Sequence, residues 1–79
     1  MNQKEQQIQP KISVSIREFA AMTGIGINRV REMCYLDGFP AYKVGNRMLI
    51  HVGAAGEWLR AKAEAKENVD VAALKRVNP

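Results

Sequence analysis

The stretch SIREFAAMTGIGINRVREM, residues 15–33, decides the fold, because it contains two short helices that only a few residues separate. Ser15 and Glu18 have the spacing of a capping box, in which each side chain accepts a hydrogen bond from the backbone N–H of the other residue. Gly24 favours the backbone turn that ends a helix. We therefore predict a first helix that begins after Ser15 and stops near Gly24. Its side chains expected in the core are Ile16, Phe19 and Ala20.

A second helix follows almost at once, with Gly26 at the position where an N-cap belongs. Its apolar residues recur at helical spacing and so mark a face that packs against the core. Asp37-Gly38 is expected to end this helix. The predicted core face consists of Ile27, Val30, Met33 and Cys34. The opposite, exposed face carries Asn28, Arg29, Arg31, Glu32 and Tyr35.

The remaining elements have shorter signals. Gly45-Asn46 stands between two apolar runs and predicts a β-hairpin. An alternating stretch before the first helix predicts a strand, and an apolar stripe after the hairpin predicts a third helix. The expected strands are residues 12–14, 41–44 and 47 (or 48)–52, and the expected third helix is residues 54–66, with Ala55, Trp58 and Leu59 buried.

The register of the hairpin depends on the length of its loop. A two-residue loop would pair Val44 with Arg47 and would divide the apolar side chains between the two faces. A three-residue loop would pair Val44 with Met48 and Tyr42 with Ile50, which unites them on one face. Because register follows the buried face, we predict the three-residue loop, although Arg47 then stands where such loops prefer Gly.

A chain of 79 residues has room for one domain. Residues 1–11 are polar and rich in Gln, so we expect them to form a flexible arm. The predicted domain spans residues 12–67, and residues 68–79 are expected to form a C-terminal tail. Asp70 is able to cap a short helix over residues 71–77, although so short a helix is marginal in water without docking.

Composition excludes several classes of protein. Twelve Lys or Arg against eight Asp or Glu give a formal net charge of +4, which favours an anionic partner. One cysteine and one histidine are too few for a disulfide framework or a His/Cys metal site. No signal peptide, membrane-spanning run or nucleophile–base pair is visible. We therefore expect a cytoplasmic protein that is not an enzyme and has no cofactor, metal, membrane or small-molecule substrate.

The order strand, helix, tight turn, helix, hairpin, helix is typical of an α+β winged helix-turn-helix, with three helices and a β-hairpin wing. In this geometry the second helix lies in the DNA major groove, and its first turns reach base edges. Asn28 and Arg29 lie on those turns and are the residue types that pair with adenine and with guanine. Lys43, Asn46 and Arg47 lie at or near the hairpin tip, where phosphates or a narrow groove would meet them.

Six short motifs resemble those of the excisionase and AlpA-type regulator family, whose small winged helix-turn-helix is related to the MerR DNA-binding domain. They are SIREFA (15–20), TGI (23–25), VREM (30–33), DGFPA (37–41), VGNR (44–47) and EWL (57–59). Each motif is weak alone, but their order and spacing together are fairly specific. The resemblance implies a DNA-binding protein of a bacterial chromosome, phage or integrative element, associated with the nucleoid.

The resemblance also implies how double-stranded DNA is bound, with the second helix in the major groove and the wing tip in the minor groove. For an excisionase it implies bending of attachment-site DNA, work with an integrase of the tyrosine recombinase type, and contacts between neighbouring protomers. Gly26 stands where relatives commonly have a Ser or Thr hydroxyl for phosphate. The contacts carried over are Asn28, Arg29, Arg31 and Glu32 on the helix and Lys43, Asn46 and Arg47 on the wing.

Three functions stay open on the sequence alone. The leading one is an excisionase, and the nearest alternative is a small AlpA- or MerR-like transcriptional regulator, which one domain of this fold does not separate from it. A protein-interaction module with an acidic partner is the alternative from another class. Two side chains have alternatives of their own. Glu32 more simply pairs with a neighbouring arginine than accepts from cytosine, and Tyr35 either donates to a phosphate or is partly buried.

Overall fold

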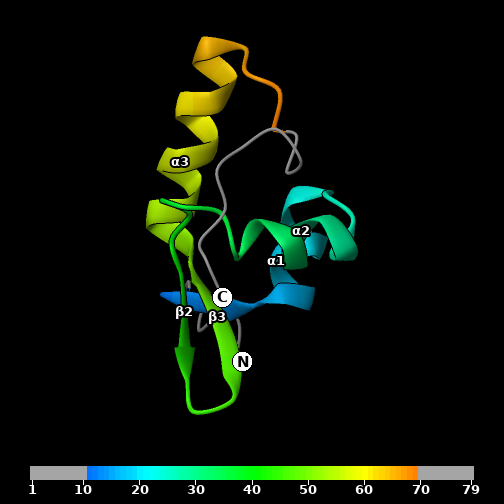
Figure 1. The fold of residues 1–79 in the computed structure, drawn as a ribbon, viewed down its shortest axis with the longest axis vertical. Helices are drawn as coiled ribbons and strands as arrows, with labels where there is room; N and C mark the ends of the chain where they lie inside the picture. Colours follow the sequence, from blue (N-terminus) through cyan, green and yellow to red (C-terminus); the bar gives the residue numbers. More distant parts are fainter. Residues whose placement is uncertain (1–10, 70–79) are drawn as a thin grey trace, which may run out of the picture.

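The computed structural model describes residues 11–69 and shows an α+β protein with three helices and a three-stranded antiparallel sheet (Figure 1). This confirms the predicted fold class and is compatible with a small winged helix. The elements are β1 (Ser13–Ser15), α1 (Ile16–Thr23), α2 (Ile27–Met33), β2 (Ala41–Val44), β3 (Arg47–His51) and α3 (Val52–Ala65). Residues 1–10 of the predicted arm, and residues 70–79 with the predicted short helix, lie outside the described residues. None of the helices described is long and apolar enough to cross a membrane.

The sheet has the strand order β1-β3-β2, so β3 pairs with both of its neighbours. Ile50 pairs with Val14 on one side and with Ala41 on the other, which places these three side chains on one face. We call it the inner face, because residues of all three helices pack against it. The opposite, outer face carries Tyr42, whose hydroxyl hydrogen-bonds to Ser13 Oγ at 2.5 Å, across β3.

The predicted three-residue loop of the hairpin is wrong. The loop has two residues, Gly45 and Asn46, and Val44 pairs with Arg47. Gly45 has a φ of 63°, which fits the first loop position of a type II′ turn, and the twist of such a turn matches that of the strands. A three-residue loop would have required a positive φ at Arg47, which is costly for a residue with a Cβ. Turn geometry therefore outweighs burial, and Tyr42 and Val44 stay exposed on the outer face.

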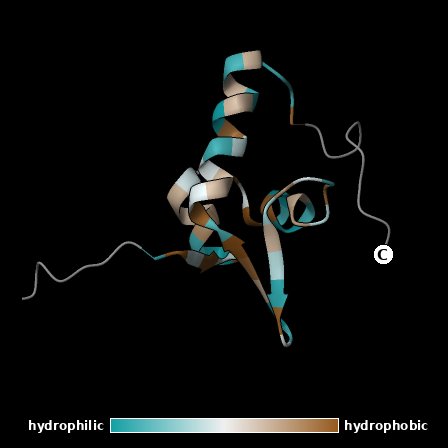
Figure 2. Ribbon diagram, turned by 90° about the vertical axis from the view of Figure 1, so that its left-hand side faces the viewer, coloured by the Kyte–Doolittle hydropathy of each residue, from teal (hydrophilic) through white to brown (hydrophobic). Residues whose placement is uncertain are grey.

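The described core is one apolar cluster between the inner face of the sheet and the three helices. Phe39 lies in the segment between α2 and β2. Its ring packs edge-on against those of Phe19 and Trp58, with 6.0 Å and 5.0 Å between the ring centroids. These contacts tie α1 and α3 to the connection that leads from α2 into the hairpin. Figure 2 shows the apolar run of β3 in brown. The buried members are Val14, Phe19, Val30, Met33, Cys34, Leu36, Phe39, Ile50 and Ala55, with Ile16, Ala20, Trp58 and Leu59 half-buried around them.

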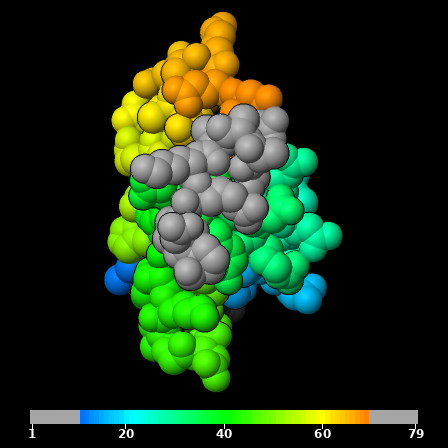
Figure 3. All heavy atoms as spheres, in the orientation of Figure 1, coloured from blue at the N-terminus to red at the C-terminus, as the bar shows by residue number. Residues whose placement is uncertain are grey.

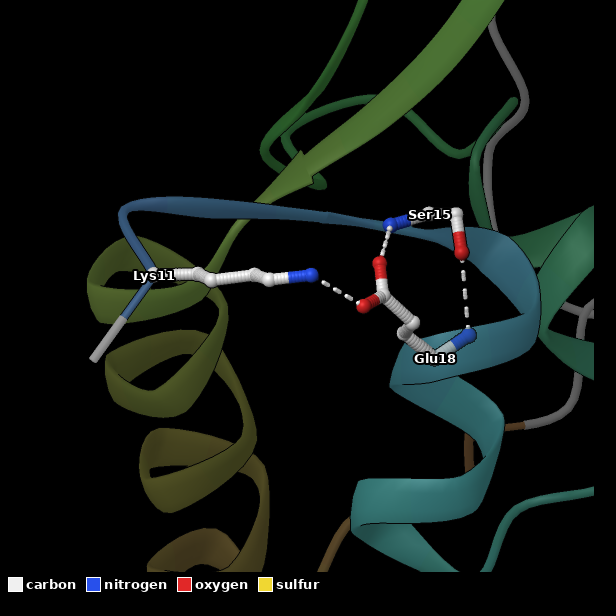
Figure 4. A network of polar contacts seen from close by, with 3 residues as sticks. All are labelled: Lys11, Ser15 and Glu18. Carbon is white, nitrogen blue, oxygen red and sulfur yellow. Dashed lines mark hydrogen bonds and ion pairs between the residues drawn. The ribbon is translucent and has the colours of Figure 1, made fainter. Parts of the chain in front are cut away.

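α1 begins with the predicted capping box. Ser15 Oγ accepts from the Glu18 N–H at 3.1 Å, and Glu18 Oε1 accepts from the Ser15 N–H at 3.0 Å (Figure 4). Lys11 Nζ donates to the other carboxylate oxygen of Glu18 at 2.5 Å. The hydrogen bond from Lys11, together with that from the Ser15 backbone, lowers the pKa of Glu18 from 4.5 to about 2. These contacts fix the point at which β1 leads into α1.

The turn between α1 and α2 also forms where the sequence predicts it. Gly24 has a φ of 80°, and its N–H donates to the Ala20 carbonyl at 2.9 Å. Thr23 Oγ1 accepts from the Ile25 N–H at 3.2 Å, and the Ile25 side chain is half-buried against the core. Gly26 is the N-cap of α2 and makes no side-chain cap. The two helices are thus joined by a tight, hydrogen-bonded turn.

α3 begins earlier than predicted because a histidine caps it. His51 Nδ1 accepts from the Ala54 N–H at 3.0 Å, and the helix starts at Val52. Lys66 ends the helix with a φ of 56°. Val69, at the end of the described chain, is half-buried against the core. The described residues after α3 therefore fold back toward the body of the domain.

Candidate nucleic-acid interface

α2 has one side in the core and the other in solvent. Val30 is fully buried, which fixes the rotation of the helix about its axis. At about 100° per residue, Asn28 and Glu32 lie opposite Val30, and Arg29 and Arg31 lie on the two flanks. All four of these polar side chains are exposed. The helix therefore presents a polar strip with one arginine on each side.

Arg31 is held against the helix surface by a neighbour on the same strip. Its Nη1 donates to Asn28 Oδ1 at 2.9 Å. A guanidinium has five N–H donors, so further donors of Arg31 remain for a ligand. The predicted pair of Glu32 with a neighbouring arginine is absent from the described part of the chain. Arg31 is engaged with Asn28, and an arginine that precedes a glutamate, as Arg29 precedes Glu32, has the less favourable orientation on a helix.

The predicted place of Tyr35 on the second helix and the predicted end of that helix at Asp37-Gly38 are wrong: α2 ends at Met33, and Tyr35 lies in the turn that follows. The N–H groups of Tyr35 and Leu36 donate to Glu32 and Met33, each at 3.0 Å, and this three-residue spacing tightens the chain. The turn carries Leu36 into the core. The Tyr35 side chain is 43% exposed, so it is partly buried and still open to solvent.

The three predicted wing residues are exposed near the turn of the hairpin formed by β2 and β3. This turn lies at the end of the molecule opposite the C-terminal end of α3 (Figure 1), and in Figure 3 the hairpin projects in green below the surface of α1 and α2. The register separates its cations, because Lys43 pairs with Met48 and Arg47 pairs with Val44. Asn46 lies in the turn itself. The structure therefore gathers the wing residues on one element but divides Lys43 and Arg47 between its two faces.

The cations of α3 are neutralised by carboxylates of the same helix and its end. Arg60 pairs with Glu57 at 2.7 Å and with Glu64 at 3.2 Å, and Lys62 pairs with Glu67 at 2.9 Å. The cations of α2 and of the hairpin differ in this respect. Among residues 11–69, no carboxylate forms an ion pair with Arg29, Arg31, Lys43 or Arg47.

Arg17 on α1 is a further cation of this kind, and the sequence motifs do not single it out as a site residue. It is exposed and has no ion pair with a carboxylate of the described chain. In helix-turn-helix geometry the first helix crosses the DNA backbone, so Arg17 is a further candidate for a phosphate contact. The sequence did contain a signal for the exposure of Arg17. Arg17 stands two residues before Phe19, and at about 100° per residue this places it on the side of the helix opposite that buried ring.

Cys34 and His51 have side chains that are able to react, but both have structural roles in this fold. Cys34 is buried, and burial raises its pKa to about 11, although the charge of Arg31 opposes the shift. A thiol in this state is a poor nucleophile. His51 uses Nδ1 for the cap of α3. Residues 11–69 contain no cluster of His, Cys, Asp or Glu that is placed to hold a metal ion.

Comparisons with protein-family models, with curated proteins and with solved structures gave no match. The candidate interface is therefore defined by this chain's own residues. It consists of a helix-turn-helix whose second helix exposes Asn28, Arg29 and Arg31, and of a hairpin that exposes Lys43 and Arg47.

Proposed function

We propose that this chain is a sequence-specific DNA-binding protein of the excisionase type. It binds and bends attachment-site DNA in the nucleoid and so assists an integrase. α2 serves as the recognition helix, and the β2–β3 hairpin serves as the wing. The observation that supports this most is the contrast in charge: cations on α2 and the hairpin have no carboxylate partner among residues 11–69, whereas Arg60 and Lys62 of α3 are paired.

The size of α2 suits a major groove. A helix with its side chains is about 10–12 Å in diameter, and the groove is about 12 Å wide. Arg29 is able to donate two hydrogen bonds to guanine. Asn28 Oδ1 accepts from Arg31 and keeps a second lone pair for a base edge. These neighbouring side chains are the proposed source of base discrimination.

A salt titration with duplex DNA tests the proposal, with Arg29→Ala and Arg60→Ala as a matched pair of variants. Each variant removes one positive charge, but Arg60 is already paired with two carboxylates. Counterion release predicts that log affinity falls with log salt by about 0.9 per neutralised phosphate. Loss of a bidentate guanine contact costs about 1–3 kcal/mol, so Arg29→Ala should lose roughly 5- to 150-fold in preference for its best site.

Arg60→Ala should keep the affinity and the sequence preference of the unmodified chain. Specific recognition by α2 is wrong if no duplex binds better than random DNA at physiological salt and the two variants behave alike. Tight binding to an acidic polypeptide under the same conditions would then favour the interaction module.

The excisionase part of the proposal has a separate test. A footprint of the protein on the attachment region of its own genetic element, together with stimulated excision by the integrase encoded beside it, would support that role. Protection of a promoter alone, with no effect on excision, would favour the AlpA- or MerR-like regulator.

A further inference from the structure

The register of the hairpin gives each wing cation its own face. Lys43 pairs with Met48, which shares the inner face with Ile50 and packs against the core. Lys43 therefore lies on the inner face of the hairpin, which is the face that the helices cover around Ile50. Arg47 pairs with Val44 and lies on the outer face. Both cations are exposed near the turn, and they leave the hairpin in opposite directions.

The thickness of the hairpin limits how it is able to meet DNA. A β-ribbon with side chains on both faces is about 10 Å thick, judged from the spacing of stacked sheets. The minor groove is only about 6 Å wide. The body of the hairpin is thus too thick for the groove, and only the turn at Gly45-Asn46 is narrow enough to enter it. The cations behind the turn then lie at the two walls of the groove, which are the phosphate strands.

The two strands are distinguished by the position of α2. In a duplex, one sugar–phosphate strand separates each major groove from the adjacent minor groove. With α2 in the major groove and the turn at the adjacent minor groove, this intervening strand passes between α2 and the inner face of the hairpin. We propose that Lys43 contacts phosphates of the intervening strand and that Arg47 contacts phosphates of the other strand bordering the same minor groove. This inference rests on the proposed DNA binding and assigns a strand to each wing cation.

The two side chains suit this division of roles. Arg47 presents a planar fork that is able to bind two oxygens of one phosphate, whereas Lys43 presents a compact charge on a flexible stem. Contacts to phosphates position a protein on DNA without reading bases. Substitution of either residue should therefore weaken binding to all sequences alike, in contrast to Arg29→Ala.

The test uses a duplex that the full chain selects from a random-sequence library. Single phosphates of this duplex are replaced, one at a time, by neutral methylphosphonates. Methylation interference at guanine N7, lost in Arg29→Ala, locates the major groove that α2 occupies and so identifies the intervening strand. The unmodified chain should lose affinity when a phosphate on either wall of the minor groove is neutralised.

The affinity of each wing variant should become insensitive to neutral phosphates on one strand only. In Lys43→Ala the effect of neutral phosphates on the intervening strand should disappear, and in Arg47→Ala the effect on the opposite strand should disappear. Each variant should also lower the salt slope by about 0.9, the value for one phosphate. Lys43→Gln and Arg47→Gln, which keep most of the side-chain length, should repeat the result. Arg60→Ala should keep both sensitivities.

Two outcomes would overturn the inference without overturning DNA binding. In one, Lys43→Ala and Arg47→Ala lose sensitivity on the same strand or with the strands exchanged. In the other, neither variant changes any sensitivity. Arg29→Ala would still weaken the selected duplex in both cases. If selection yields no preferred duplex and Arg29→Ala has no effect, the proposed function fails and this inference fails with it.

Discussion

Two substitutions of glycine by alanine, at Gly45 in the hairpin turn and at Gly56 inside α3, should change stability in opposite directions. Available space does not distinguish them, because a Cβ at either position meets no atom within 4 Å outside its immediate neighbours. The backbone does distinguish them. Gly45 has a φ of 63°, which strains any residue with a Cβ, whereas Gly56 has helical backbone.

The expected difference follows from these conformations. A non-glycine residue in a sparsely populated backbone region costs about 1–3 kcal/mol. Replacing a glycine inside a helix by alanine gains about 1 kcal/mol, since alanine loses less conformational entropy on folding. The two variants should therefore differ by at least about 2 kcal/mol in the free energy of unfolding. For a domain of this size that corresponds to a separation of at least about 8 °C in Tm.

Urea and thermal unfolding followed by far-ultraviolet circular dichroism measure both values. We expect Gly45→Ala to be less stable than the unmodified chain and Gly56→Ala to be more stable, with equal denaturant m values. A Gly45→Ala protein as stable as the unmodified chain would refute the positive φ at the turn. The two-residue register, and with it the division of Lys43 and Arg47 between two faces, would then be wrong as well.

Three further predictions concern the core, the start of α1 and the buried thiol. Phe39→Ala removes a ring that contacts two others and should cost about 3–5 kcal/mol of unfolding free energy, against less than about 1.5 kcal/mol for Phe39→Leu. Urea denaturation measures both, and a loss below about 1.5 kcal/mol for Phe39→Ala would show that the ring contacts do not hold the core together. Hydrogen bonds from Lys11 and from the Ser15 backbone hold the pKa of Glu18 at about 2, so the stabilisation by its carboxylate is complete above pH 4.5 and is lost as the pH falls toward 2. The stability difference between the unmodified chain and Glu18→Gln should narrow over that interval, and a difference independent of pH would contradict the network. Because burial raises the pKa of Cys34 to about 11, a thiol reagent should label it only through unfolding, and fast labelling that urea does not accelerate would contradict its burial.

The helix-turn-helix was predictable because its signals are local. The capping box of Ser15 and Glu18 and the turn at Gly24 each depend on residues within one turn of helix, and the structure shows both. The exposure of Arg29 and Arg31 follows in the same way from the helical period around buried Val30. These parts of the candidate site needed no knowledge of tertiary structure.

The hairpin register was not predictable in this way because two preferences disagree at one place. The apolar side chains of Tyr42 and Val44 favour a shared buried face, while Gly45 favours a two-residue turn, and only the assembled sheet shows that the turn prevails. The start of α3 was misplaced for another reason. His51 caps it through a ring nitrogen, and histidine is not among the residue types that usually mark a helix start.

The self-pairing of charges on α3 has a consequence for how the molecule approaches a partner. The charges on the solvent side of α3 and at its C-terminal end cancel in number. The cations are Arg60, Lys62 and Lys66, and the carboxylates are Glu57, Glu64 and Glu67. The excess positive charge of residues 11–69 therefore lies on the side of α1, α2 and the hairpin, away from the far end of α3, and gives this part of the chain an electric dipole. Under the proposed DNA binding, the field of a duplex would turn this side of the chain forward before any contact forms. Loss of a hairpin cation should then slow association more than it speeds dissociation.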